Sequence, residues 1–425
     1  MNSALPNYEQ AAAVVAAYAA RLGSGNRPTS EIVELDRASG RVLASPLRAD
    51  EDQPPFARST RDGYACRADE ASQHTPLRIA GATHAGEAPS GPLPLGAAWE
   101  IMTGAPVPAG ADAVMMIEHV EKSGSPVDHV RLLPPRKIKA GDNIVAQAAQ
   151  ARRGEELLPA GFTLGAAQIA LAATCGQASV DVFGRPRVAI LTTGDELVAI
   201  DAVPGPGQIR NSNAPMLAAL VAAAGGEPWI LPTAADTAPA LDAALAQAVK
   251  ADLLLISGGV SAGKFDLVEP ALARLGAHFQ FTGVRIQPGK PLVFGELPLT
   301  AAESHRGGVL PFFGLPGNPI SSAVTFLLFA TPVLAALGGK RDSGPRFALA
   351  HLSRDTERQG KPGLTRFLPA LCDFNPAIGK LPEVATVPWH GSGDLAAFAR
   401  SNCFLVIPEE EGFLEAGSTV RILLP

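Results

Sequence analysis

The chain has 425 residues, of which 47% are hydrophobic and 18% charged, and its formal net charge is −6. At about 150 residues per domain this length predicts roughly three domains, and the composition is that of a folded protein without long disordered tracts. The acidic balance argues against broad nucleic-acid binding, which needs a clustered basic surface. We therefore expect several packed domains and no nucleic-acid partner.

Cysteine usage and hydrophobic patterning favour a cytoplasmic protein. The four cysteines are far apart and form no Cys-x-x-Cys pair, which excludes the common zinc and redox motifs and fits a reducing compartment. The N-terminal segment lacks the leading positive charge of a signal peptide. The most hydrophobic stretch, 323–337, is shorter than a membrane span and contains Thr325, Thr331 and Pro332. We expect it to be a core helix, and we expect no membrane segment.

The first 185 residues combine helical and β-rich patterns. Helical patterns flank a segment that is rich in Pro and Gly and contains short apolar runs at 99–102 and 113–117. This arrangement predicts a β-rich domain that is inserted into a discontinuous helical platform. The predicted boundaries are 48–148 for the insertion and 1–47 with 149–185 for the platform, whose helical patterns cover about 8–43 and 164–175.

Strand-like and helix-like patterns alternate over 186–338. Such alternation predicts a central parallel sheet that is covered by helices. Small or acidic residues follow several of these strands, which is where open α/β sheets bind ligands. The expected strands are 187–191, 229–231, 253–256 and 312–315, and the expected helices are 214–224, 241–249 and 267–275.

The last part of the chain, 339–425, contains separate short apolar runs and predicts a C-terminal β-barrel. The fold class expected for the whole chain is therefore multidomain α/β plus β. The β runs of this last domain lie at 347–349, 367–369, 384–387 and 420–423.

A glycine-rich turn follows the strand at 253–256 and precedes a helical pattern. Glycines allow bare backbone amides to approach a phosphate, and a helix N-terminus adds partial positive charge. Phe265 stands where a Walker A loop needs a hydroxyl, so a standard P-loop is excluded, but Asp266 offers a carboxylate for a divalent ion. The alternative is a tight turn that binds nothing. The proposed phosphate-binding residues are Gly258, Gly259, Ser261, Gly263 and Lys264.

Several short motifs occur together in a defined order. They are STRDGYA at 59–65, IMTGA at 101–105, TGDEL at 193–197, the glycine-rich turn with Asp266, and QPGKP at 287–291 with GLPGNP at 314–319. Together these motifs resemble the molybdopterin molybdenumtransferases, the molybdenum-insertase family that includes the gephyrin E domain. The resemblance covers essentially the whole chain. It implies a transferase that takes adenylylated molybdopterin and molybdate, releases AMP and leaves molybdenum on the dithiolene.

The resemblance also implies which residues act. It implies a homodimer, in which Asp62 and Thr103 reach the active cleft from the partner, and protein partners such as molybdopterin adenylyltransferase and apo-molybdoenzymes. Carboxylates at neighbouring strand ends suit a divalent cation such as Mg²⁺. The predicted metal ligands are Glu196, Asp236 and Asp266, and the predicted catalytic residues are these three with Asp62, Thr103 and Ser392. The predicted substrate-binding residues are Gly258, Gly259, Ser261, Gly263, Lys264, Arg285, Pro288, Gly289, Lys290, Pro316, Gly317, Asn318 and Pro319.

Each of these residues has a simpler structural interpretation. Asp195–Glu196 and Asp236 each precede a possible helix, where an acidic side chain can act as an N-terminal cap. Asp62 before a glycine is common in turns. The segment 316–319 can simply shape the turn before a helix, and Lys290 can be an ordinary surface lysine.

The sequence departs from the family pattern at two places. An arginine and an acidic residue usual after 143–144 are absent, and two usual lysines are replaced by Gly283 and Gln287. Residues 283, 285 and 287 would share one face of a strand, so we predict that Arg285 restores a cation there, with Lys264 as another.

Two other functions stay open: these losses sustain the first, and a resemblance of 186–337 to another enzyme suggests the second. The first is a carrier or scaffold that holds molybdopterin or the finished cofactor without inserting metal. The second is a molybdopterin adenylyltransferase, which the additional domains count against. The retained acidic residues, Asp62, Glu196, Asp236 and Asp266, favour catalysis, because a carrier of an anionic ligand has little use for four carboxylates.

Overall fold

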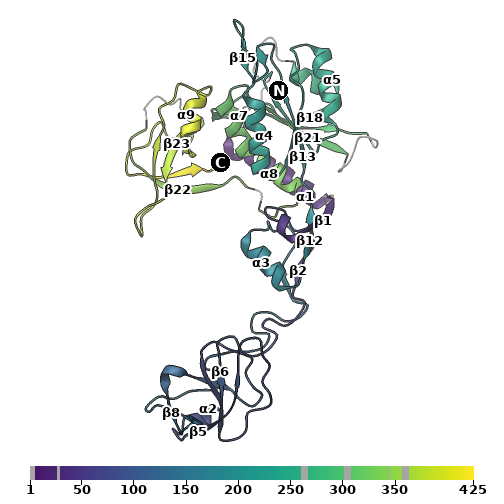
Figure 1. The fold of residues 1–425 in the computed structure, drawn as a ribbon. Coiled ribbons are helices and arrows are strands. Elements are labelled where there is room, and N and C mark those ends of the chain that lie inside the picture. Colours follow the sequence, from purple (N-terminus) through teal and green to yellow (C-terminus); the bar gives the residue numbers. More distant parts are fainter. Residues whose placement is uncertain (1–4, 26–28, 260–266, 301–307, 343, 357–362) are drawn as a thin grey trace. The chain divides into compact units, whose positions relative to one another are not determined.

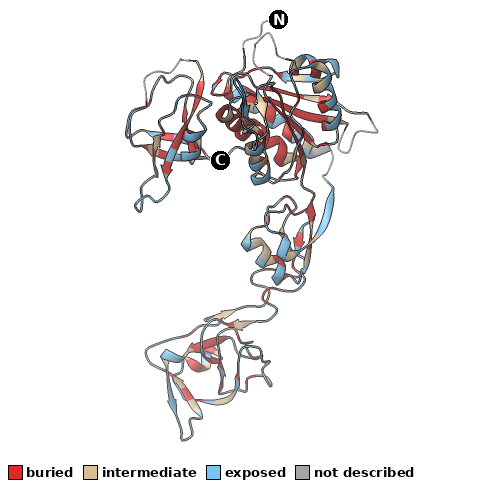
Figure 2. Cartoon of the chain, turned by 45° about the horizontal axis from the view of Figure 1, so that its top comes forward, coloured by how far each residue is buried: buried red, intermediate tan, exposed pale blue. Residues whose placement is uncertain are grey.

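The structure is a computed structural model that describes residues 5–25, 29–259, 267–300, 308–342, 344–356 and 363–425 (Figure 1). The chain forms two compact units. The first unit comprises Met1–Ala44, Gly161–Gly165 and Asp181–Pro425, and the second comprises Ser45–Ala160 and Ala166–Val180. Each unit has its own hydrophobic core (Figure 2).

The second unit is built on a six-stranded sheet with the strand order β7-β4-β6-β5-β9-β8. Its core contains Tyr64 and Met115, which are almost fully buried. This sheet lies inside the range predicted for the β-rich insertion, whose exact boundaries stay a prediction. The strands are β4 (Gly63–Cys66), β5 (Leu77–Thr83), β6 (Ala97–Ile101), β7 (Ala113–Met116), β8 (Val120–Ser123) and β9 (His129–Leu132). Short pairs β2–β11 (Leu47–Arg48, Glu156–Leu158) and β3–β10 (Arg58–Ser59, Ile144–Val145) and helices α2 (Ala68–Ala71) and α3 (Ala166–Thr174) complete the unit.

The first unit begins with helix α1 (Tyr8–Gly25), whose buried residues recur with helical spacing. The sequence pattern predicted helix as far as about residue 43, but α1 ends at Gly25. Strand β1 (Ser30–Glu34) follows instead and pairs with β12 (Ser179–Phe183). The adjacent β-branched residues Ile32 and Val33 favour an extended chain there.

The centre of the first unit is a six-stranded sheet with the order β16-β13-β17-β21-β20-β18. The four strands that the sequence predicted are parallel: β13 (Arg187–Thr192), β16 (Glu227–Ile230), β17 (Leu253–Ser257) and β21 (Val309–Leu315). The sheet is nevertheless mixed. Strands β18 (His278–Phe281) and β20 (Val293–Pro298), which were not predicted, add an antiparallel edge.

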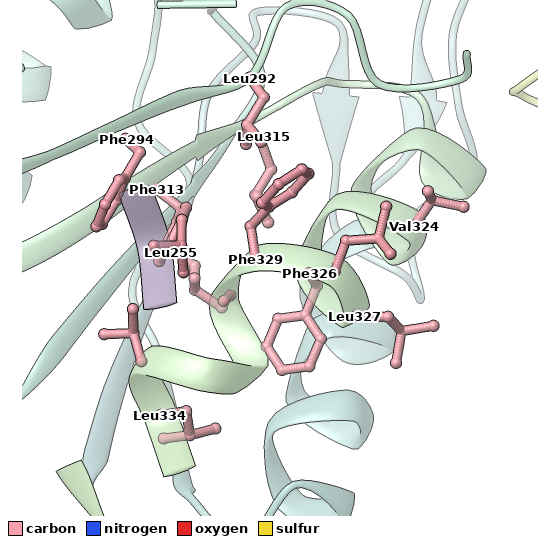
Figure 3. Packing of buried hydrophobic residues seen from close by; sticks show 14 of the residues in the cluster. Leu255, Leu292, Phe294, Phe313, Leu315, Val324, Phe326, Leu327, Phe329 and Leu334 are labelled. Atoms are coloured by element: carbon pink, nitrogen blue, oxygen red, sulfur yellow. The ribbon is translucent and has the colours of Figure 1, made fainter. Parts of the chain in front are cut away.

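Helices cover both faces of this sheet, so its central strand is apolar on both sides. Leu253 and Leu255 of β17 face one core, and Leu254 and Ile256 face the other. Figure 3 shows the first of these cores, in which Phe313 packs among side chains from several elements. The helices are α4 (Asn213–Ala223), α5 (Ala238–Ala248), α6 (Val268–Arg274), α7 (Pro319–Thr325) and α8 (Thr331–Leu337).

The run Pro319–Leu337 joins α7 to α8 through one π-helical turn, Phe326–Ala330. By length and composition this run would suffice to cross a membrane, but 94% of it is buried inside the protein. It is therefore packed as the core helix that the sequence predicted. The π turn lies just before Pro332, which has no N–H to donate, and the Thr331 hydroxyl donates to the carbonyl of Phe326 at 3.2 Å.

The C-terminal strands close into a five-stranded barrel, which confirms the predicted fold class. Its closed ring is β23–β24–β22–β26–β25, and β25 pairs back with β23. A short strand from the preceding segment, β19 (Ile286–Gln287), also pairs with β23. The barrel elements are β22 (Phe347–Leu352), β23 (Thr365–Asp373), β24 (Glu383–Thr386), α9 (Leu395–Arg400), β25 (Cys403–Ile407) and β26 (Thr419–Leu423).

Candidate active site

A pocket of about 920 Å³ lies at the carboxyl ends of the parallel strands in the first unit. This is the edge at which open α/β sheets bind ligands. The pocket brings together loops that follow β13, β16, β17 and β21, the turn after β19, and two segments of the barrel. Its lining residues are Thr193, Gly194, Glu196, Asp236, Gly258, Gly259, Ile286, Gln287, Pro288, Gly289, Lys290, Pro291, Pro316, Gly317, Asn318, Ser321, Leu364, Trp389, Gly391 and Ser392.

The two described glycines of the glycine-rich turn are required by the backbone. Gly258 and Gly259 have φ of 100° and 63°, which residues with a Cβ rarely adopt. A Cβ on Gly258 would also lie 2.5 Å from the carbonyl oxygen of Thr193. The amide of Gly258 donates to the carbonyl of Leu315 at 3.3 Å, so Gly258 shapes the turn and leaves phosphate binding to other amides. The predicted residues Ser261, Gly263, Lys264 and Asp266 lie outside the described residues.

An acidic group lies at the ends of β13 and β16. The backbone amide of Asp236 donates to Oδ1 of Asp195 at 3.0 Å, and Glu196 lines the same pocket as Asp236. Partial desolvation raises the pKa of Asp236 above its ordinary value, and the nearby carboxylates of Asp195 and Glu196 raise that pKa further.

Both helix-cap interpretations of these residues are wrong. Thr237, not Asp236, caps α5, because its hydroxyl accepts the amide of Ala240 at 3.4 Å. The chain after Glu196 forms strand β14 (Leu197–Val198), which pairs with β15 (Ile209–Arg210), and not a helix. Both acidic positions therefore keep carboxylates available to the pocket.

The pocket contains two carboxylates that could serve as ligands of a hard cation. Glu196 and Asp236 both line the pocket, and carboxylate oxygens are the ligands that Mg²⁺ prefers. Within the described part of the chain no group of three His, Cys, Asp or Glu side chains is placed to hold a metal ion.

A polar network beneath the pocket, which the sequence did not reveal, centres on Asn213 at the start of α4. Its amide nitrogen donates to the hydroxyl of Ser257 at 2.8 Å and to the carbonyl of Gly317 at 2.6 Å. Ser257 also lies 3.4 Å from the hydroxyl of Ser322. Asn213 thus joins the ends of β17 and β21 to α4. The one sequence signal was a polar side chain that opens an otherwise apolar helix.

The Asn213→Ala substitution should destabilise the protein by about 1 kcal/mol, because two partners lose a hydrogen bond in a half-buried place. It should also raise the KM for the substrate by about tenfold, since two pocket loops lose their common tether. Chemical denaturation and steady-state kinetics measure the two effects. Asn402→Ala is the matched control, because it also removes two bonds, to the backbone of Cys372 in the barrel. Equal KM values for the two variants would contradict the tethering role.

The turn before α7 is linked to the barrel, and it contains several predicted residues. Asn318 occupies the N-cap position of α7 but makes no side-chain cap bond, and its amide nitrogen instead donates to the hydroxyl of Ser392 at 2.9 Å. The amide of Ile320 donates to the carbonyl of Ser392 at 3.0 Å. Pro316, Gly317, Asn318 and Ser392 all line the pocket, whereas Pro319 begins α7 and is not among the described lining residues.

The turn after β19 supplies Pro288, Gly289 and Lys290 to the pocket, but not Arg285. Arg285 forms an ion pair with Glu409, with Nη1 and Oε1 2.8 Å apart. The prediction that 283, 285 and 287 share a strand face is wrong, because the strand covers only Ile286–Gln287 and a Cβ on Gly283 would meet Leu5 at 2.8 Å. Lys290 is the one Lys or Arg among the described lining residues.

Asp62 and Thr103 form a pair in the second unit. Oδ1 of Asp62 accepts from the amide of Thr103 at 2.7 Å and from its hydroxyl at 2.8 Å. These two hydrogen bonds, the backbone one first, lower the pKa of Asp62, which keeps the carboxylate ionised. Asp62 is therefore more than a turn residue, since it joins two segments that carry separate motifs. Both side chains are exposed.

Several lining residues were not predicted as site residues from the sequence, and two of them are large apolar side chains from the C-terminal part of the chain. Leu364 and Trp389 belong to the barrel and reach the pocket because the barrel packs beside the turns after β19 and β21. No local sequence pattern marks either residue as part of a site.

Comparison with known families assigns three regions that together cover most of the chain. Residues 6–176 match the MoeA N-terminal region (domain I and II), residues 189–336 match a probable molybdopterin binding domain, and residues 355–424 match the MoeA C-terminal region (domain IV). These three matches follow each other in chain order.

Relatives and solved structures agree with these matches. The chain is 36% identical to the molybdopterin molybdenumtransferase of Nostoc sp. over 93% of this chain and 88% of that one, and 35% identical to that of Bacillus subtilis over 93% and 90%. Two crystal structures of the molybdopterin biosynthesis MoeA protein from Pyrococcus horikoshii have TM-scores of 0.73 and 0.78 at 30% and 28% identity, with 99% of this chain covered and 99% and 100% of theirs. The chain therefore belongs to the molybdopterin molybdenumtransferases, a family of transferases.

Proposed function

We propose that this transferase takes adenylylated molybdopterin and molybdate, cleaves the phosphoanhydride bond, releases AMP and leaves molybdenum on the dithiolene of molybdopterin. The observation that carries this proposal is the pocket that places a glycine turn and two carboxylates, Glu196 and Asp236, within one cavity. A phosphate group needs the first feature, and a cation that neutralises phosphates needs the second.

The residues of the pocket divide this work between them. The turn at Gly258–Gly259 lets backbone amides approach the bridging phosphates without a Cβ in the way. A cation held by Glu196 and Asp236 would neutralise the charge that develops as the phosphorus–oxygen bond breaks. Positioning and charge neutralisation are sufficient for phosphoryl cleavage. Cleavage adds one water molecule across the phosphoanhydride bond. On insertion, the two dithiolene sulfurs displace one oxygen of molybdate, which leaves as water with the two thiol protons.

We propose Lys290 as the cation that binds molybdate. It is exposed, lies beside Gly289 and is the one Lys or Arg among the described lining residues of the pocket. Lys290→Ala should raise the molybdate concentration for half-maximal turnover by about tenfold or more, because a charge-assisted hydrogen bond to an oxyanion is lost. A molybdate titration of AMP release measures this. Lys250→Ala, on an exposed lysine after α5, is the control, and equal molybdate dependence in both variants would remove Lys290 from the site.

Cation binding should depend on pH through Asp236. The folded protein holds a proton on this carboxylate more tightly than the unfolded chain does, because its pKa is raised. The stability from this proton is full below the ordinary pKa of aspartate, about 4, and is lost as the pH rises through the raised value. Mg²⁺ competes with the proton, so its affinity should fall as the pH drops through the raised pKa of Asp236. Calorimetric titration measures it, and an equally steep fall in Asp236→Asn would contradict this assignment.

The decisive test of the function is AMP release from adenylylated molybdopterin by the purified protein, coupled to activation of an apo-molybdoenzyme. Molybdate- and Mg²⁺-dependent release with activation would support insertion. Tight binding without AMP release would favour the carrier or scaffold function. Formation of the adenylylated compound from ATP would favour the adenylyltransferase function.

We also propose that the enzyme acts in the cytoplasm as a homodimer, with molybdopterin adenylyltransferase and apo-molybdoenzymes as partners. In this proposal Asp62 and Thr103 serve the pocket of the partner subunit. Two observations support this proposal: hydrogen bonds hold Asp62 and Thr103 together, and both side chains are exposed. The family resemblance supports it as well. Mixing inactive Asp62→Ala and Asp236→Asn proteins tests it. With random exchange, half of the dimers are mixed and each has one complete site, so recovery of about a quarter of wild-type turnover supports action between subunits. If the subunits exchange and no turnover returns, action between subunits is contradicted.

A further inference from the structure

The pocket has one aromatic side chain among its described lining residues, Trp389. It lies between β24 and α9, and part of the side chain packs against the main core of the first unit. Leu364, Ile286 and Pro288 extend the apolar part of the lining. The charged residues of the pocket, by contrast, come from loops after β13 and β16 and from the turn after β19.

The loop that carries Trp389 is fixed at several points. Before it, the amide of Val387 donates to the carbonyl of Pro369 at 2.9 Å. After it, the carboxylate of Asp394 accepts from the amide of His390 at 3.1 Å and from the amide of Ala397 at 3.0 Å. Ser392 is bonded to the turn before α7 by both its hydroxyl and its carbonyl. The indole is thus supported by its loop before any ligand binds, which lowers the entropic cost of binding.

An anion-binding region beside one fixed aromatic face suits a phosphate that is attached to a flat heterocycle. Flat heterocycles stack on tryptophan, and removal of such a stacking residue commonly weakens binding of a base about tenfold. We propose that Trp389 is the stacking platform for a planar nitrogen heterocycle of the substrate. The proposal rests on the function proposed above, because that substrate carries two such rings, an adenine and a pterin, at the ends of one pyrophosphate.

Binding measurements with the intact protein separate the two rings. The probes are AMP, pterin-6-carboxylic acid and inorganic pyrophosphate, and the variants are Trp389→Ala and Trp389→Phe, each checked for folding by circular dichroism. We expect Trp389→Ala to bind one heterocycle about tenfold more weakly and pyrophosphate as well as the wild type does. Trp389→Phe should keep most of the affinity, because it retains an aromatic face. The probe that is affected identifies the ring.

Fluorescence and kinetics give readouts that a merely structural role would not change. In a Trp99→Phe, Trp229→Phe background the emission comes from Trp389 alone, and the bound heterocycle should quench it. Trp389→Ala should raise KM with kcat within about threefold. Trp229→Ala is the control, since Trp229 stacks on Arg187 at 3.8 Å and is not among the lining residues.

The outcomes distinguish this proposal from the function on which it rests. Wild-type affinity of Trp389→Ala for both heterocycles, in a protein that still releases AMP, would overturn the platform and leave the function intact. An equal loss of pyrophosphate affinity in Trp389→Ala would also overturn the stacking role, because the substitution would then have disturbed the pocket as a whole. A wild-type protein that neither binds the heterocycles nor releases AMP would overturn both proposals.

Discussion

The Asp236→Asn variant is expected to release AMP about 100- to 1,000-fold more slowly than the wild type, which is the usual cost of removing one electrostatic stabiliser of a reacting group. Asp236 is one of the two described carboxylates in the lining of the pocket. The substitution removes one charge and preserves the shape of the side chain. The hydrogen bond to Asp195 should persist, because its donor is the backbone amide.

Product analysis by chromatography at saturating substrate measures this loss. Asp242→Asn is the matched control on the following helix, where Asp242 forms an exposed ion pair with Arg274 at 2.8 Å. Such pairs contribute about 0–1 kcal/mol, so turnover should stay within a few-fold of the wild type. Excess Mg²⁺ should partly restore the rate of AMP release by Asp236→Asn, because Glu196 can still bind the cation. Normal turnover of Asp236→Asn without added cation would refute its role in holding one.

The second large effect concerns the core of the first unit. Phe313→Ala should lower the free energy of unfolding by about 3–5 kcal/mol, through lost apolar burial and the cavity that remains. Phe313 is fully buried in β21 and stacks on Phe294 with ring centroids 4.5 Å apart and an interplanar angle of 12° (Figure 3). The stacked pair adds to the loss, because aromatic contacts contribute beyond their area.

Urea denaturation in a Trp99→Phe background isolates this effect, because Trp229 and Trp389 both belong to the first unit. Phe374→Ala serves as the control. Phe374 follows β23 and is 47% exposed, so its truncation should change the free energy of unfolding by less than about 0.5 kcal/mol. A loss below about 1 kcal/mol in Phe313→Ala would show that the core relaxes around the cavity.

Local patterns predicted the parallel strands and the helices between them well. Leu253–Ser257 is a continuous apolar run that ends at a glycine turn, and both features are visible within a few residues. The antiparallel edge was missed because pairing between 278–281 and 293–298 depends on contacts across the sheet, which local propensity does not encode. Strand β25 was also missed, although its apolar run Cys403–Ile407 has the local composition of a buried strand.

The site was predictable where a motif marks a strand end. The glycine turn follows its strand directly, Glu196 and Asp236 lie within a few residues of theirs, and the structure brings all three to one pocket. Arg285 was misplaced because its side chain was assigned from strand alternation, whereas a partner more than 100 residues away, Glu409, determines its position. Trp389 reaches the pocket because its loop packs against the turn before α7, and such a tertiary contact cannot be predicted from sequence spacing.

Because the barrel contributes to the pocket, the parts of the pocket are synthesised at different times during translation. Leu364, Trp389 and Ser392 leave the ribosome after the strands of the parallel sheet and the loops that follow them, and the turn at 287–291 is held by strand pairing between Ile286 and Thr365. During translation the nascent chain can thus expose the glycine turn and the acidic loops before that side of the pocket exists. A protein product truncated before residue 364 would lack this wall, so a damaged message should yield a chain that cannot enclose a reactive intermediate.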